Sequence, residues 1–200
     1  MLSFASAVFF LIITPGPGVL SAAGMGAGYG FRAGLRYVVG LFVGTNLVAL
    51  AVISGLAAVV LGMPVVRNVL LIASAGYLLY LAGRIAFAGS NIAFIEARRP
   101  PGIMSGIMLQ IINPKAYAVN TTLFSGFAFY PGSFAIETAS KLAIMSVIWI
   151  PIHLVWLYAG ATLERLNLGA RRQFHINLLM ALSMLVVVGL ALWSNFARQP

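Results

Sequence analysis

Two short stretches of the sequence combine residues that could hold a small charged solute. Each has a proline beside polar groups: Thr14-Pro15-Gly16-Pro17 in the first, and Gln110 followed by Asn113-Pro114-Lys115 in the second. Proline has no amide hydrogen for a helix, and the residue before it favours extended geometry. Each stretch should therefore leave backbone groups unpaired. Free amides at a helix start attract carboxylates, and free carbonyls can accept a hydrogen bond from an ammonium. The candidate binding residues are Thr14, Pro15, Gly16, Pro17, Gln110, Asn113, Pro114 and Lys115.

Lys115 and two further polar residues, His153 and Asn46, lie within apolar segments. Lys115 is near the middle of its segment, where an ionisable group costs about 2.5 to 3.5 kcal/mol, so we interpret it as a site residue rather than one that reaches an interface. His153 could titrate near neutral pH or only pack through a hydrogen bond. Asn46 could line a cavity or join two helices. Lys115 and His153 are the candidate proton carriers, and Asn46 is a further candidate for substrate binding.

The composition indicates where these residues lie. Of the 200 residues, 62% are hydrophobic and 8% are charged, whereas a soluble domain has about half apolar and about a quarter charged residues. A membrane-spanning helix needs roughly 20 mostly apolar residues, and most of the chain divides into such lengths. The first segment lacks the positive charges of a secretory signal, so we expect it to remain in the protein. The net charge of +9 then reports orientation in a membrane, not a nucleic-acid partner.

The sequence predicts an all-α membrane protein, with residues 1–200 forming a single transmembrane domain. The connecting loops are short. Six spans are expected, at roughly Leu2 to Ala27, Tyr37 to Leu61, Asn68 to Ala88, Ile103 to Tyr130, Thr138 to Leu163 and Gln173 to Ser194.

A weak internal repeat relates the two halves. Ile12-Ile13-Thr14-Pro15 is echoed 99 residues later by Ile111-Ile112-Asn113-Pro114, and hydropathy matches at the same offset. Because each half would hold three helices, the two halves must have opposite orientation in the membrane, which is the inverted-repeat plan of many secondary transporters. We therefore expect one repeat over about 1–99 and a second over about 100–200, with breaks in the first and fourth helices. Alternatively, the prolines only kink these helices.

The basic residues predict the orientation. Eight lie in or beside odd-numbered loops, against three (Arg67, Lys141 and Arg198) assigned to even-numbered loops and the C-terminal tail. Since basic loops stay in the cytoplasm, both termini are expected outside it.

Several motifs together resemble the LysE/RhtB family of amino-acid exporters. They are Thr14-Pro15-Gly16-Pro17-Gly18, the stretch from Gly30 to Leu35 with Gly40 and Gly44, the stretch from Tyr77 to Leu81, and Asn113-Pro114-Lys115-Ala116. The resemblance implies a multi-pass carrier of the bacterial cytoplasmic (inner) membrane that expels an amino acid or related metabolite, with protons as the exchanged ion. Some relatives have an acidic residue in the fifth span, where an ungapped match places His153. Here His153 or Lys115 would have to carry the proton.

The missing carboxylate also bears on the substrate. The sequence has no aspartate, and its glutamates fall in loops or at span ends. A second positive charge would meet Lys115 with nothing to offset it, so a neutral amino acid or a small anionic or zwitterionic metabolite is expected.

A passive channel and a non-catalytic structural subunit remain alternatives, whereas no nucleophile–base pair or metal cluster indicates an enzyme. We expect no cofactor and no metal. The partners expected are a small-molecule substrate and the lipid bilayer, and the oligomeric state is open, with a homodimer as one option.

Overall fold

The computed structural model describes residues 1–56 and 100–165, together with isolated positions between 63 and 83 and between 174 and 186. The first two ranges form five helices without a strand: α1 (Leu2–Ile13), α2 (Pro17–Ile53), α5 (Ile103–Ile112), α6 (Pro114–Gly126) and α7 (Phe134–Arg165). The all-α prediction is therefore confirmed for this part of the chain. The third and sixth predicted spans lie almost wholly outside the described residues, so the six-span count stays a prediction.

Both predicted helix breaks are present. The first separates α1, which ends at Ile13, from α2, which begins at Pro17; between them Gly16 is fully extended, with φ −171° and ψ −179°. The second separates α5 from α6 at Asn113, which is also extended, with φ −80° and ψ 106°. In each case a proline is the first residue of the following helix, a position where its fixed φ suits the helix and its missing amide hydrogen is not needed.

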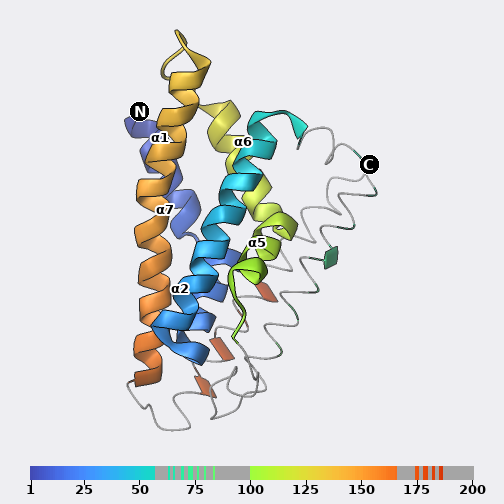
Figure 1. Cartoon of the computed structure of the whole chain (residues 1–200), viewed down its shortest axis with the longest axis vertical. Helices are drawn as coiled ribbons and strands as arrows, with labels where there is room; N and C mark the ends of the chain where they lie inside the picture. The colour runs from blue at the N-terminus through green and yellow to red at the C-terminus, as the bar shows by residue number, and fades with distance from the viewer. Residues whose placement is uncertain are drawn as a thin grey trace.

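The loop expected between the first two spans is reduced to a tight turn inside α2. Helical geometry continues on both sides of Gly30, which alone is non-helical, with φ 74° and ψ 172°. A positive φ is readily adopted by glycine and rarely by other residues. The chain reverses direction there, at the lower end of the molecule in Figure 1, so the first predicted span ends later than Ala27 and the second begins before Tyr37.

The two broken segments run in opposite directions. In Figure 1, α1 and the first part of α2 descend from the N-terminus, whereas α5 and then α6 ascend, and α7 descends along the full length of the bundle. Opposite directions are what an inverted repeat requires. The repeat itself remains a prediction, because its third helices lie outside the described residues.

Close packing of α2 against its neighbours depends on small residues. A Cβ added at Gly26 would overlap the carbonyl oxygen of Leu157 in α7, and one added at Gly40 would overlap the carbonyl oxygen of Ile103 in α5. Such contacts let membrane helices approach closely. By length and composition, α2 and residues Phe134–Thr162 of α7 could cross a membrane, and α1 and α5 are shorter apolar helices.

Lys141 is not a loop residue, contrary to the prediction. It lies inside α7 and is only 3% exposed. Its ammonium is 2.7 Å from Glu137, one turn earlier in the same helix, and 5.7 to 6.0 Å from the ring centroids of Phe4, Phe124 and Phe129. A buried cation needs such a paired environment. Without Lys141, the predicted balance of eight to three becomes eight to two, and the orientation stays a prediction.

Candidate functional site

A cavity of about 60 Å³ lies where the two breaks meet. Because each water molecule needs roughly 10 to 15 Å³ of such space, it has room for a few waters or for a small polar head group. Five elements contribute to its wall. It is lined by Leu11, Ile12, Gly16, Gly18, Val19, Thr45, Gln110, Asn113, Lys115, Ala116, Val119, Asn120, Met145, Trp149 and His153.

Lys115 joins one break to the other. Its ammonium donates a 2.5 Å hydrogen bond to the backbone carbonyl of Thr14, one of the groups that the first break leaves without a helical partner. The lysine side chain lies against Gly16, where an added Cβ would be 2.8 Å from Cδ and 3.0 Å from Nζ. The absence of a side chain at Gly16 is thus what allows Lys115 to reach the carbonyl.

A chain of hydrogen bonds fixes the polar side chains beside Lys115. Asn113 donates through Nδ2 to Oε1 of Gln110 at 2.8 Å, and Gln110 donates through Nε2 to the hydroxyl of Thr45 at 2.6 Å. All three residues are buried. Asn113 Oδ1 also accepts from the backbone amide of Lys115 at 3.0 Å. The amide of Gln110 therefore connects α5 to α2 and holds Asn113 in place.

The two helix starts differ in what they offer a ligand. At α6, the Asn113 side chain caps the helix by accepting from an amide of its first turn. At α2, the cap position is Gly16, and no side chain caps the helix. Among the described residues, the amides of Gly18 and Val19 have no hydrogen-bond acceptor, and both residues line the cavity. The start of α2 is therefore the open one.

His153 has a ring nitrogen beside that start which makes no hydrogen bond to any described residue. Its Nδ1 is 3.0 Å from the carbonyl oxygen of Trp149, and its ring stacks on the Trp149 indole with centroids 3.5 Å apart. Because a carbonyl can only accept, Nδ1 must carry a hydrogen, so Nε2 is the lone-pair atom of the neutral ring. A Cβ added at Gly18 would be 3.3 Å from Nε2, which places this nitrogen at the cavity wall.

Asn120 supplies an acceptor that lacks a partner. Its Nδ2 donates to the carbonyl of Ala116 at 2.8 Å, while its Oδ1 accepts no hydrogen bond from any described residue, although Asn120 is only 1% exposed. Unsatisfied buried oxygens are uncommon in native proteins. A ligand donor in the cavity would satisfy this one.

The lining carries positive charge without an opposing carboxylate. Among the described residues that line the cavity, Lys115 is the one formally charged residue and His153 is the one further titratable group. Within the described residues no cluster of His, Cys, Asp or Glu could hold a metal ion. The site therefore favours a ligand that brings its own negative charge.

The structure gathers some of the sequence-derived candidates at the cavity and leaves others outside the lining. Gly16, Gln110, Asn113, Lys115 and His153 line it. Five candidates are not in the lining. Thr14 accepts the Lys115 hydrogen bond through its carbonyl, and Pro17 and Pro114 start their helices. Pro15 is exposed, and Asn46 donates instead to the Phe42 carbonyl at 2.8 Å.

Sequence reasoning missed Thr45, Asn120 and Trp149. Asn120 follows Asn113 by seven residues, which is two helical turns and so the same helix face; this spacing could have revealed it. Thr45 shares the buried face of α2 with Leu41 and Val48, at three- to four-residue intervals, and this pattern could have favoured it over Asn46.

Comparison with known proteins identifies the family of the chain. The model of the LysE type translocator family matches residues 9–195. The chain is similar to a leucine efflux protein of Enterobacter sp. (strain 638), with 26% identity over 166 residues that cover 78% of this chain and 77% of the relative. It is also similar to a cysteine/O-acetylserine efflux protein of Escherichia coli O139:H28, with 28% identity over 173 residues, 85% of this chain and 87% of the relative. No solved structure matches it. The chain therefore belongs to the LysE type translocator family, whose members are transporters of the inner membrane and not enzymes, as the motif resemblance predicted.

Proposed function

We propose that the protein is a proton-coupled carrier that exports a neutral amino acid with a small or medium apolar side chain, and that the cavity between the two breaks is its binding site. The observation that carries this proposal is the meeting of an uncapped helix start, a lysine and, among the described residues, a buried amide oxygen without a donor in one cavity. These groups match the two charged ends of an amino acid.

The carboxylate of the substrate would bind at the start of α2. The free amides of Gly18 and Val19 point positive partial charge at that position, and the Lys115 ammonium lies beside Gly16. A carboxylate that replaces water there gains charge-assisted hydrogen bonds, which are stronger than neutral ones.

The ammonium would be bound by two oxygens, one from a side chain and one from the backbone. Asn120 Oδ1 is buried without a donor, and the Thr14 carbonyl is freed by the first break. The side chain would lie against the apolar lining, which includes Leu11, Ile12, Val119 and Met145. A lining of this kind favours leucine-like side chains over charged ones.

The names of the relatives support the same class of substrate. Leucine, cysteine and O-acetylserine, which appear in those names, share the neutral zwitterionic form. A second ammonium on lysine or arginine would meet Lys115 without a carboxylate in the lining to offset it. We therefore expect neutral amino acids to be transported and cationic ones to be rejected.

His153 is our proposed proton carrier, with Lys115 as the alternative. In the neutral ring Nε2 can take up a proton at the cavity wall, and protonation turns this acceptor into a donor. A protonated His153 beside Lys115 would strengthen carboxylate binding, and its deprotonation would weaken it. This difference would link proton movement to release of the substrate.

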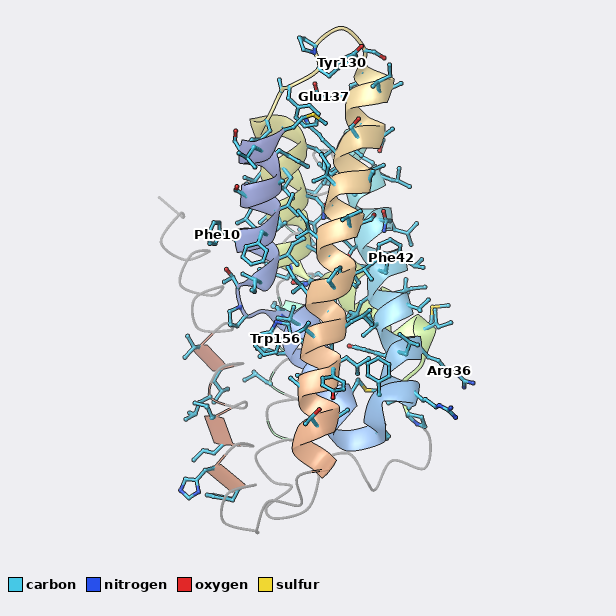
Figure 2. All side chains as sticks on the ribbon, turned by 90° about the vertical axis from the view of Figure 1, so that its left-hand side faces the viewer. Phe10, Arg36, Phe42, Tyr130, Glu137 and Trp156 are labelled. Carbon is cyan, nitrogen blue, oxygen red and sulfur yellow. The ribbon has the colours of Figure 1, made fainter. Side chains whose placement is uncertain are left out.

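We further propose alternating access between two inverted repeats, with both termini outside the cytoplasm. Figure 2 shows Arg36 at the end of the bundle opposite Tyr130 and Glu137, and the N-terminus lies at the latter end in Figure 1. Since basic residues mark the cytoplasmic side, this arrangement supports an external N-terminus. A homodimer remains an option on which this proposal does not depend.

Transport by the purified protein in proteoliposomes tests the proposal. Labelled leucine, cysteine and lysine are compared, with and without a pH gradient, and counterflow is measured for each. Gradient-responsive counterflow of leucine or cysteine but not of lysine is expected. Net flux without counterflow would indicate a passive channel instead, and no flux of any substrate would favour a structural subunit.

A further inference from the structure

The bond between Lys115 and Thr14 suggests what the site does when it is empty. We infer that Lys115 occupies the position of the substrate ammonium in the empty carrier, and that an incoming amino acid displaces it from the Thr14 carbonyl. This inference rests on the proposed function and identifies which bond the substrate must break.

The geometry of the lysine carries the inference. A primary ammonium already sits 2.5 Å from the Thr14 carbonyl, which is the group that an α-ammonium would need. Among the described residues, Lys115 makes no ion pair, and its ammonium is hydrogen-bonded to this carbonyl instead. A side chain held by one carbonyl can move away when a carboxylate offers a stronger partner.

Displacement would move Lys115 from one partner to another over a short path. Its aliphatic chain already lies against Gly16, next to the amides of Gly18 and Val19 where the carboxylate is expected. The substrate ammonium would thus replace the lysine at the Thr14 carbonyl, and the substrate carboxylate would accept a hydrogen bond from the displaced lysine. Because Thr14 follows α1 and Lys115 belongs to α6, the exchange also releases the direct tie between the two breaks.

The prediction that distinguishes displacement from simple charge repulsion uses an uncharged probe. Removal of Lys115 would help any cation to bind, but a hydroxyl gains only if a carbonyl has become vacant. The probes are 2-hydroxy-4-methylpentanamide and 4-methylpentanamide, which differ by the α-hydroxyl alone and carry no carboxylate that would draw Lys115 away from the carbonyl. Their affinities are compared by competition against labelled leucine, and directly by calorimetry, in the wild type and in Lys115→Met.

In the wild type the α-hydroxyl should add little affinity, because Lys115 holds the carbonyl. In Lys115→Met the hydroxy amide should bind about 2- to 10-fold more tightly than the amide without the hydroxyl, which is the range of a neutral hydrogen bond. Lys141→Met is the matched control: Lys141 also donates to a backbone carbonyl, that of Phe124 at 3.3 Å, but does not line the cavity. Its hydroxyl contribution should equal that of the wild type.

The outcomes separate the displacement of Lys115 from the proposed function. An unchanged hydroxyl contribution in Lys115→Met, with leucine still bound by the wild type, overturns the displacement and leaves the proposed function standing. Failure of the wild type to bind leucine or another neutral amino acid refutes the proposed function itself. Lys115→Leu gives the same comparison should the methionine variant not be recovered as folded protein, as judged by gel filtration.

Discussion

Replacing Gly18 by alanine should separate the stability of the protein from its transport. Gly18 lies in the first turn of α2 and lines the cavity. An added Cβ would be 3.3 Å from His153 Nε2 and 3.6 Å from Gln110 Nε2. The new methyl group would therefore stand between the helix start and the proposed proton carrier.

The magnitudes follow from these distances. Alanine favours a helix over glycine by about 1 kcal/mol, while the 3.3 Å contact is close and the stacked His153 ring can yield only slightly, so the net change in stability should stay below about 1 kcal/mol. A cavity of about 60 Å³ holds roughly four to six waters at 10 to 15 Å³ each. A methyl group removes about one such position and covers Nε2. Loss of one hydrogen bond to a charged group costs roughly 1.5 to 3 kcal/mol, so we expect gradient-driven efflux of leucine to fall about ten- to a hundredfold.

The assay compares thermal unfolding in detergent with efflux from proteoliposomes. Gly126→Ala is the control, since Gly126 ends α6 and no atom lies within 4 Å of its added Cβ; both properties should match the wild type. Gly26→Ala is the opposite case, because its Cβ overlaps the backbone of α7, and it should lower stability. Wild-type efflux with a normal response to pH in Gly18→Ala would refute the placement of the transport site.

Three further predictions concern the break, the buried ion pair and the orientation. Pro15→Ala combined with Pro17→Ala should favour a continuous first helix, so the variant should insert and unfold like the wild type but lose efflux; normal efflux would make the break a mere kink. Glu137→Gln should lower the unfolding temperature more than the double change with Lys141→Met, because the single change leaves a buried ammonium unpaired; the reverse order would show that the pair is dispensable. A reporter fused to the C-terminus should be active only outside the cytoplasm, and activity only inside it would overturn both the orientation and the six-span count.

The breaks and the residues beside them were predictable because their causes are local. Proline acts on its own turn of helix, so Pro15 and Pro114, which follow the caps of α1 and α5, located the ends of these helices without knowledge of any neighbour. The same holds for Lys115, whose charge is conspicuous in any apolar segment. That both breaks line one cavity depends on packing between helices, which no local pattern contains.

The remaining differences arise from tertiary contacts. Lys141 looked like a loop charge because sequence alone did not show the three phenylalanine rings and the Phe124 carbonyl around its ammonium. Its pairing with Glu137, four residues earlier, is local and follows helical spacing. A longer loop was expected where the structure has a tight turn at Gly30. A single glycine with a positive φ is enough to reverse the chain there, and the sequence did not show which of the nearby glycines would adopt it. Asn46 and Thr45 are adjacent, and only the rotation of α2 decides which of them meets the cavity.

The central claim is that a neutral amino acid binds in the cavity between the breaks, and protection of a single thiol tests it most directly. The chain has no cysteine, so Val119→Cys places the sole thiol in the lining, and Ser54→Cys places one at the exposed end of α2 as a control. We predict that saturating leucine slows the reaction of Val119→Cys with a small thiol reagent at least severalfold, while lysine does not and Ser54→Cys reacts at the same rate throughout. Equal rates for Val119→Cys with and without leucine, in protein that still transports leucine, would contradict the account.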